Sequence, residues 1–322
     1  TSPEPSMTGI EISPQEESIE SGESMPFAAL AHFSDLSEKD ATGASEWSVS
    51  PSEAGAIDGN GLFTASLSFT GTATVMASYN EVSDQADLTI TPGTITDING
   101  NVYHRIVIGE QEWMAENLRV TRYRDGTNIP TGLSDAQWKN TTSGAYAVYP
   151  HEDISGLTSE VEVAQALGNL YNWHAVDDSR GLCPEGWVVP SDADWNILLY
   201  HVMSKGYPNE SDDPDGAGNA LKSRRQVNSP LGEPWATSQH PRWDSDDTHY
   251  GKDAFGFSGL PGGIRADYGT FRDVGRYGYW WSSSENGTSL SAWSWILSSS
   301  GGRVTTISYG KRMGFPVRCL RD

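Results

Sequence analysis

Pro190-Ser-Asp-Ala-Asp-Trp-Asn-Ile-Leu-Leu-Tyr-His-Val-Met203 combines a helix start with a helical hydrophobic period. Ser191 followed three residues later by Asp194 is a capping pattern, in which each side chain can satisfy a backbone N–H of the helix start. The apolar residues that follow have the spacing of one helix face, and they are Trp195, Leu198, Leu199, Val202 and Met203. We therefore expect an amphipathic helix here, with these five side chains facing a core.

A second helix and a set of strands flank this segment. Ser159 and Glu162 repeat the capping pattern and predict a helix that runs to about His174. Beyond residue 220 the chain offers only strand-like runs separated by Gly-rich loops. We expect strands at residues 103–108, 292–297 and 301–308. Helices early and strands late predict an α+β domain with antiparallel sheets and long loops.

Charge and tryptophan divide the chain into two parts. The 322 residues favour two domains, and a formal charge of −22 disfavours binding to nucleic acid or anionic membranes. Residues 1–93 carry 15 acids, one base and one Trp, whereas residues 94–322 carry 28 acids, 20 bases and eleven Trp. No run approaches the roughly 20 apolar residues that cross a bilayer. The turn signal Thr91-Pro-Gly93 marks the expected boundary.

Residues 8–92 have the pattern of a small all-β domain. Residues 72–79 and 86–90 alternate apolar and polar side chains, as strands with one buried face do. Asp58-Gly-Asn-Gly61 supplies residues for tight turns. Six motifs follow in order: Ile10-Glu-Ile-Ser-Pro14, Ser21-Gly-Glu23, Glu46-Trp-Ser48, Gly55-Ala-Ile-Asp-Gly59, Gly61-Leu-Phe-Thr-Ala65 and Gly71-Thr-Ala-Thr-Val75. The segment resembles the bacterial Ig-like domain of group 2, which implies a β-sandwich spacer without a site, after a flexible tether at residues 1–7.

Residues 94–322 carry a second resemblance. The motifs are Thr96-Asp-Ile-Asn-Gly-Asn-Val-Tyr103, Gln111-Glu-Trp-Met-Ala-Glu-Asn-Leu118, Gly168-Asn-Leu-Tyr-Asn-Trp173, Leu182-Cys-Pro-Glu-Gly-Trp-Val-Val-Pro190, Gly218-Asn-Ala-Leu-Lys222, Phe255-Gly-Phe-Ser-Gly-Leu-Pro-Gly-Gly263, Gly278-Tyr-Trp-Trp-Ser-Ser-Ser-Glu285 and Gly314-Phe-Pro-Val-Arg-Cys-Leu-Arg-Asp322. They resemble the Fibrobacter succinogenes major paralogous domain family, with insertions near residues 153–166 and 205–216. The resemblance implies a C-type-lectin-like fold and a surface protein that binds glycans or acts as an adhesin.

Cys183 and Cys319 are the only cysteines of the chain. A disulfide between them would close a loop of about 137 residues and stabilise the fold by roughly 5 kcal/mol in the chain-entropy model. Two buried thiols in a reducing compartment are the alternative. Both positions fall inside the motifs shared with the major paralogous domain, and this resemblance supports their pairing.

Catalytic motifs are weak throughout the chain. Gly256-Phe-Ser-Gly259 resembles half of a nucleophile elbow, but Leu260 stands where the strand-to-helix turn should continue. With 43 acids, paired carboxylates are too common to indicate glycoside hydrolysis. A structural disulfide would remove the cysteines that oxidase chemistry needs. We expect no enzyme, and a glycan-active enzyme is the less favoured alternative.

Metal-binding patterns are also incomplete. The acidic loop Glu210-Ser-Asp-Asp-Pro-Asp-Gly216 fails as an EF-hand because Lys222 stands where a bidentate Glu belongs. Glu233-Pro-Trp235 has a Trp where calcium-dependent lectins carry Asn or Asp. A third group lacks the spacing of a metal site: His240, Asp244, Asp246, Asp247 and His249. We expect no cofactor, with an irregular calcium site in the acidic loop as the alternative.

Tryptophans fall into two groups by their sequence surroundings. Those inside family motifs are expected in the core, with each indole N–H bonded internally: Trp113, Trp173, Trp187, Trp280 and Trp281. Aromatic residues elsewhere have polar neighbours, which suits a sugar site, because sugars stack an apolar face on a ring and bond polar groups at the rim. The candidate ligand-binding residues are Trp235, Trp243, Tyr250, Asp267, Tyr268, Arg272, Asp273, Trp293 and Trp295. Arg265 matches the family pattern and is expected to form an internal ion pair.

These features support a non-enzymatic, monomeric surface protein as the leading hypothesis. Its lectin-like domain would bind carbohydrate, and its Ig-like domain would hold that domain away from the cell. Thr1-Ser-Pro-Glu-Pro-Ser6 has neither a starting Met nor an apolar signal core, which suggests that an export signal has been removed. These six residues would also suit a flexible tether that follows a lipid-modified cysteine, as in a Gram-negative outer-membrane lipoprotein. A surface adhesin or structural component that binds a protein partner is the alternative.

Overall fold

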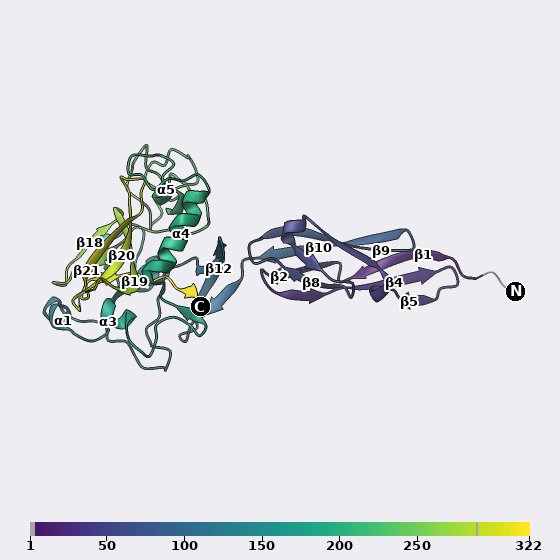
Figure 1. The fold of residues 1–322 in the computed structure, drawn as a ribbon, viewed down its shortest axis with the longest axis horizontal. Coiled ribbons are helices and arrows are strands. Elements are labelled where there is room, and N and C mark those ends of the chain that lie inside the picture. The colour runs from purple at the N-terminus through teal and green to yellow at the C-terminus, as the bar shows by residue number, and fades with distance from the viewer. Residues whose placement is uncertain (1–3, 288) are drawn as a thin grey trace. The chain divides into compact units, whose positions relative to one another are not determined.

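The computed structural model describes residues 4–287 and 289–322 of the chain. The chain forms two compact units, one ending at Thr94 and the other running from Ile95 to Asp322. The first unit consists of strands and two short 3₁₀ helices (Thr42–Ala44 and Ser52–Ala54), and the second is a mixture of helices and sheets (Figure 1). Within the described residues, no helix combines the length and the apolar character that a membrane span requires.

The first unit consists of three sheets around one core. Its strands are β1 (Met7–Ser13), β2 (Glu16–Glu20), β3 (Ser24–Pro26), β4 (Ala28–Phe33), β5 (Glu38–Asp40), β6 (Glu46–Ser50), β7 (Gly55–Ile57), β8 (Leu62–Ala65), β9 (Gly71–Tyr79) and β10 (Val82–Thr91). The sheet orders are β2-β10-β9-β6, β1-β4-β5 and β3-β8-β7. β10 buries every second side chain, Ala86, Leu88 and Ile90, so the predicted alternation is confirmed.

The start of this unit differs from the expected tether at residues 1–7. Met7 already pairs with Phe33 across β1 and β4, and the Ser34 N–H donates to the Ser6 carbonyl over 2.9 Å. The ladder thus includes residues that the sequence offered no reason to order. The predicted turn between β7 and β8 contains Gly61 at φ +76°, where an added Cβ would lie 2.3 Å from the Phe27 carbonyl.

The second unit is built from three further sheets and short helices. Its helices are α1 (Asp135–Asn140), α2 (Glu160–Leu167), α3 (Trp173–Val176), α4 (Asp192–Ser204) and α5 (Ala217–Leu221). Its strands are β11 (Thr94–Thr96), β12 (Val102–Ile108), β13 (Gln111–Met114), β14 (Tyr146–Ala147), β15 (Leu170–Asn172), β16 (Trp187–Val188), β17 (Gly262–Arg265), β18 (Phe271–Val274), β19 (Tyr277–Glu285), β20 (Ser291–Ser298), β21 (Thr305–Gly310), β22 (Gly314–Phe315) and β23 (Leu320–Arg321). The sheet orders are β11-β12-β13-β23-β16, β14-β15-β22-β17-β18 and β19-β20-β21. The expected antiparallel sheets are present.

Helix α4 confirms the capping prediction and corrects one core residue. The Ser191 and Asp194 side chains bond each other's backbone N–H groups at the helix start. Trp195, with the leucines and valine of the predicted face, is buried, but Met203 is 41% exposed. Met203 lies in the last turn of α4, where the apolar face extends past the core.

The other predicted helix is shorter than expected. Ser159 caps α2, but the helix ends at Leu167 rather than near His174. Gly168 takes φ +79°, and an added Cβ there would lie 2.9 Å from the Leu118 carbonyl, so the chain turns and crosses a neighbouring segment. The predicted strand at 301–308 likewise begins only at Thr305.

The chain's two cysteines form a disulfide inside the second unit. Cys183 and Cys319 are bonded, with Cα atoms 6.0 Å apart, and both side chains are buried. The bond connects the segment before β16 with the segment before β23, which are neighbours in one sheet. The predicted pairing is therefore confirmed.

Candidate functional site

The structure places Trp243 in the core, so its expected exposure was wrong. The side chain is 1% exposed, and its indole N–H donates to the Gly259 carbonyl over 3.1 Å. The buried ammonium of Lys222 lies 5.4 Å from the ring centroid. The flanking residues Arg242 and Asp244 are partly or fully exposed, whereas the indole between them points into the core. The prediction was wrong because it inferred the exposure of Trp243 from its polar neighbours.

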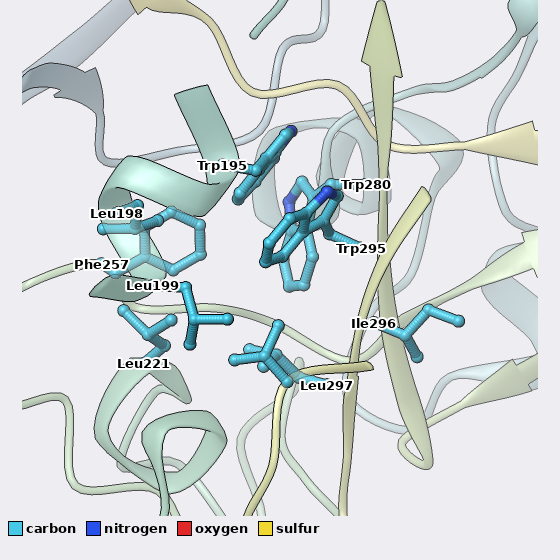
Figure 2. Close-up of a pocket in the computed structure, with 10 residues that line it drawn as sticks. Trp195, Leu198, Leu199, Leu221, Phe257, Trp280, Trp295, Ile296 and Leu297 are labelled. Carbon is cyan, nitrogen blue, oxygen red and sulfur yellow. The ribbon is translucent and has the colours of Figure 1, made fainter. Parts of the chain in front are cut away.

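Trp295 is also a core residue, against the expectation. Its ring stacks on Trp195 of α4 with centroids 5.6 Å apart, and its N–H donates to an Asp192 carboxylate oxygen over 2.9 Å. Figure 2 shows the two rings among leucines and Phe257. The void between these side chains measures about 10 Å³, barely enough for one water, so it is a packing defect and not a ligand site. Trp295 failed as a candidate because α4 covers its face of β20.

The segment after β17 forms a hairpin that separates its four candidates. Tyr268 is 48% exposed, and its hydroxyl accepts a long hydrogen bond of 3.5 Å from Arg272. Arg272 also pairs with Asp273 at 3.5 Å. Asp267 faces a different pocket, which His174 and basic residues line. Tyr268, Arg272 and Asp273 thus contact one another, and the four candidates share none of the described pockets.

The remaining tryptophan expectations had mixed outcomes. Trp293 is half-buried on β20 and lines none of the described pockets. The tryptophans of the family motifs are buried as predicted: Trp113, Trp173, Trp187, Trp280 and Trp281. The indole N–H groups of Trp173, Trp280 and Trp281 have internal acceptors. The same prediction was wrong for Trp113, whose N–H has no acceptor among the described residues.

Arg265 confirms the predicted internal pair. Its guanidinium lies 3.5 Å from the Asp135 carboxylate and donates to the Leu133 carbonyl over 2.6 Å. The guanidinium also lies 4.4 Å from the Trp138 ring centroid. Burial lowers the pKa of Arg265, although the Asp135 carboxylate opposes that shift.

Two candidates, Trp235 and Tyr250, come together at one open pocket of about 330 Å³. We call it the Trp235 pocket, and its lining residues are Arg224, Leu231, Trp235, Tyr250 and Lys252. Ligand pockets typically measure roughly 300–1,000 Å³, so the space suits one or two sugar rings. Trp235 and Tyr250 are both partly exposed, so each ring presents apolar surface to solvent.

Backbone hydrogen bonds hold Trp235 in place. The Trp235 N–H donates to the Gly232 carbonyl over 2.9 Å, which closes a turn, and the Trp235 carbonyl accepts from the N–H of Gln226 over 3.3 Å. Gln226 is buried, and its side chain donates to the Asp246 carbonyl over 2.6 Å. The turn that carries the Trp235 ring is thus fixed by hydrogen bonds to a buried residue.

A close backbone approach brings the two cations of the pocket together. An added Cβ at Gly251 would lie 1.8 Å from the Ser223 carbonyl, so only glycine lets these segments pass. The Arg224 Nε then donates to the Lys252 carbonyl over 2.9 Å. The Arg224 guanidinium lies 5.4 Å from the Trp235 centroid, and the Lys252 ammonium lies 5.7 Å from that of Tyr250.

Sequence reasoning missed Arg224, Leu231 and Lys252. A signal existed for the cations, because Arg224-Arg225 and Lys252 are bases in a chain with twice as many acids as bases. Only the fold, however, shows that residues 224, 235 and 252 meet, since no periodicity links them. Leu231 is 41% exposed and carries no sequence signal.

Three other pockets lack an exposed aromatic platform. One of about 360 Å³ is lined by Thr141, Thr142, His174, Asp267, Ser289, Leu290, Gly310, Lys311 and Arg312. Burial and the Lys311 and Arg312 cations lower the pKa of His174. The others, of about 410 and 240 Å³, surround Arg242 and Arg124. Each is polar enough to hold water, but none offers the flat ring that a sugar face needs.

The suspected metal-binding groups are engaged in local hydrogen bonds. Among the described residues, no three His, Cys, Asp or Glu side chains converge as a metal site would require. Asp213 of the acidic loop accepts from the Asp215 N–H over 2.7 Å, and Asp246 accepts from the N–H groups of Thr248 and His249. These carboxylates stabilise turns.

Family models match both units of the chain. The Fibrobacter succinogenes major domain matches residues 106–321, and the bacterial Ig-like domain of group 2 matches residues 6–90. The first match covers well over half of the chain, so this protein belongs to the Fibrobacter succinogenes major domain family, with a bacterial Ig-like domain of group 2 at its N-terminal side.

Individual relatives are more distant. Ice-binding protein 1 of Shewanella frigidimarina is 28% identical over 165 residues, which is 50% of this chain and 18% of that protein. The chain therefore matches less than a fifth of its relative's length. Two structures of the S-layer protein SbsC have TM-scores of 0.25 and 0.24, with 11% and 10% identity over 44% of this chain and 18% of theirs. These scores are too low to support an argument about fold.

Proposed function

We propose that this chain is a non-enzymatic, exported surface protein whose second unit binds carbohydrate in the Trp235 pocket. One observation carries the proposal. Trp235 and Tyr250 are partly exposed, share an open pocket, and have hydrogen-bond donors beside them. Among the pockets described above, only these two of the nine candidate residues line the same one.

The arrangement fits the chemistry of sugars. The Trp235 ring offers a flat apolar surface to a pyranose C–H face, and the fixed turn beneath it lowers the entropy that binding costs. The Arg224 and Lys252 donors lie at the rim, where they can bond hydroxyl oxygens. The pocket is open, so affinity at a single site should be modest and tight attachment would require several sites.

Surface placement is supported by family membership and by the disulfide. The matching domains accompany a disulfide, which suits an oxidising compartment. The relative named above is an ice-binding protein, which is consistent with a protein outside the cell. We propose that the second unit has a C-type-lectin-like fold, that the Ig-like unit is a spacer, and that an N-terminal lipid holds the monomer at an outer membrane.

A binding assay with one variant and one matched control tests the proposal. The full chain is screened on a glycan array, and the best ligand is titrated by calorimetry. Trp235→Ala should weaken binding about tenfold or more, because a stacked ring is a typical binding hot spot. Tyr268→Ala is the control, since that ring is exposed but lies outside the pocket. Equal losses in both variants, or no glycan bound by the wild type, would refute the proposal.

A protein partner is the second candidate at the same residues. Trp, Tyr and Arg are the commonest hot-spot residues of protein interfaces, and exposed Leu231 adds apolar surface beside them. A pull-down of a defined protein that Trp235→Ala abolishes, together with an empty glycan array, would favour this function.

A further inference from the structure

The Trp235 pocket has an unusual charge for this chain. The protein carries 43 acids and 21 bases, and its second unit remains acidic. The pocket nevertheless has two cations, Arg224 and Lys252, and no carboxylate among its lining residues. A site for neutral sugars has no need of this, since Asn, Gln and carboxylates bond hydroxyls equally well.

Arg224 has unused capacity for an anion. Its side chain is exposed, its Nε is fixed on the Lys252 carbonyl, and it forms no ion pair within residues 4–287 and 289–322. The charge of Arg224 favours the ionised form of Asp253, but Asp253 does not line the pocket. Its carboxylate already accepts hydrogen bonds from the N–H and the hydroxyl of Ser258. A guanidinium anchored at Nε keeps its two terminal nitrogens for one planar anion.

The ion-pair partner of Lys252 is a weak one. Its ammonium pairs with Asp215, whose side chain is 63% exposed. Exposed ion pairs contribute little and are screened by salt, so a ligand carboxylate can compete with Asp215 for the ammonium. Lys252 therefore supplies a second positive charge at the other aromatic ring of the pocket.

We infer that the ligand is an acidic saccharide, and this inference rests on the proposed function. A carboxylate or sulfate group on the sugar ring faces Arg224 while the ring stacks on Trp235. A hexuronate has this combination, because its carboxylate projects from the edge of a ring that keeps an apolar face. A sulfated hexose offers the same charge on a longer arm.

Matched polymers separate charge from shape. The full chain is titrated with polygalacturonate and with its fully methyl-esterified form, and in parallel with a sulfated galactan and its desulfated form. The expected result is binding at least about tenfold tighter to an acidic member than to its neutral partner, since hydrogen bonds to charged groups are the stronger ones. The preference should shrink between 50 and 300 mM salt. The better acidic polymer identifies carboxylate or sulfate as the group that binds.

Variants then locate the charge. Arg224→Gln should remove most of the acid preference and keep weak binding to the neutral form, and Arg224→Lys should restore part of it, because a single ammonium lacks the planar fork. Arg276→Gln is the control, since that arginine is exposed outside the pocket. Circular dichroism checks that each variant is folded, and Lys252→Gln provides a second route if Arg224→Gln is not.

Each other outcome overturns a different claim. Equal affinity for acidic and neutral polymers would refute the charge preference and leave the sugar site standing. Acid binding that survives both Arg224→Gln and Lys252→Gln would place the anion elsewhere and refute the inference. Failure of the wild type to bind any polymer or arrayed glycan would refute the proposed function itself.

Discussion

Lys222 provides a prediction that depends on the packing of the second unit alone. Its side chain is fully buried, and its ammonium donates to the carbonyls of His249 over 2.5 Å and Ser298 over 2.8 Å. Burial lowers the pKa of Lys222 from 10.5 to about 7, and only the Asp246 carboxylate opposes the shift. A lysine of the unfolded chain keeps the ordinary pKa near 10.4.

The direction in which the free energy of unfolding changes with pH follows from the number of protons that each state binds. Between about pH 7 and pH 10.5 the unfolded chain holds a proton on Lys222 that the folded chain has released, so the free energy of unfolding rises with pH in this window. Below about pH 7 both states are protonated and the burial cost is fully present. The slope is about 1.4 kcal/mol per pH unit within this window, and it becomes smaller within about one pH unit of either pKa. We expect a gain of about 2–3 kcal/mol from pH 7 to pH 9.5.

The assay is urea denaturation followed by tryptophan fluorescence. Eleven of the twelve tryptophans belong to residues 94–322, so this signal reports the unit that contains Lys222. The range stops at pH 9.5 because raised tyrosine pKa values, such as that of Tyr279, lower the stability once unfolded tyrosines ionise. Lys222→Met is the reference and should show a flat profile. An equal rise in Lys222→Met, or no rise in the wild type, would refute the reasoning.

Two further predictions test the core of the second unit. Trp243→Ala should lower the free energy of unfolding by about 3–5 kcal/mol, because it empties a buried site, and a loss below 1 kcal/mol in the same denaturation assay would show that the ring is exposed. Reduction of Cys183–Cys319, which are 136 residues apart, should cost about 2–5 kcal/mol, measured as the shift in urea midpoint with and without reductant. An unchanged midpoint would mean that the bond is absent in solution.

Local signals predicted the framework of the second unit correctly. Ser191 and Asp194 cap α4 as predicted, because a capping pattern needs only residues within one turn. The pairing of Cys183 with Cys319 followed from the family motifs, since no local rule joins positions so far apart. The early end of α2 escaped prediction, because Gly168 is required by a tertiary crossing against Leu118.

The candidate site was predicted only in part, for a physical reason. Polar neighbours in the sequence indicate where the backbone lies near the surface, but they do not indicate whether an indole side chain points into solvent or into the core. Trp243 and Trp295 therefore proved to be core residues despite charged or polar surroundings. Trp235 is partly exposed because its turn rests on Gln226, and its partner Arg224 depends on the close approach at Gly251. Such contacts join segments that are distant in sequence.

The central claim is that a sugar ring lies against Trp235, and the indole N–H signals of a ¹⁵N-labelled chain test it most directly. The twelve tryptophans give one signal each, and comparison with Trp235→Ala assigns the signal of interest. Addition of the acidic oligosaccharide should shift the Trp235 signal and leave those of Trp243 and Trp295 in place. Saturable shifts confined to other indoles, with Trp235 unmoved, would contradict the account.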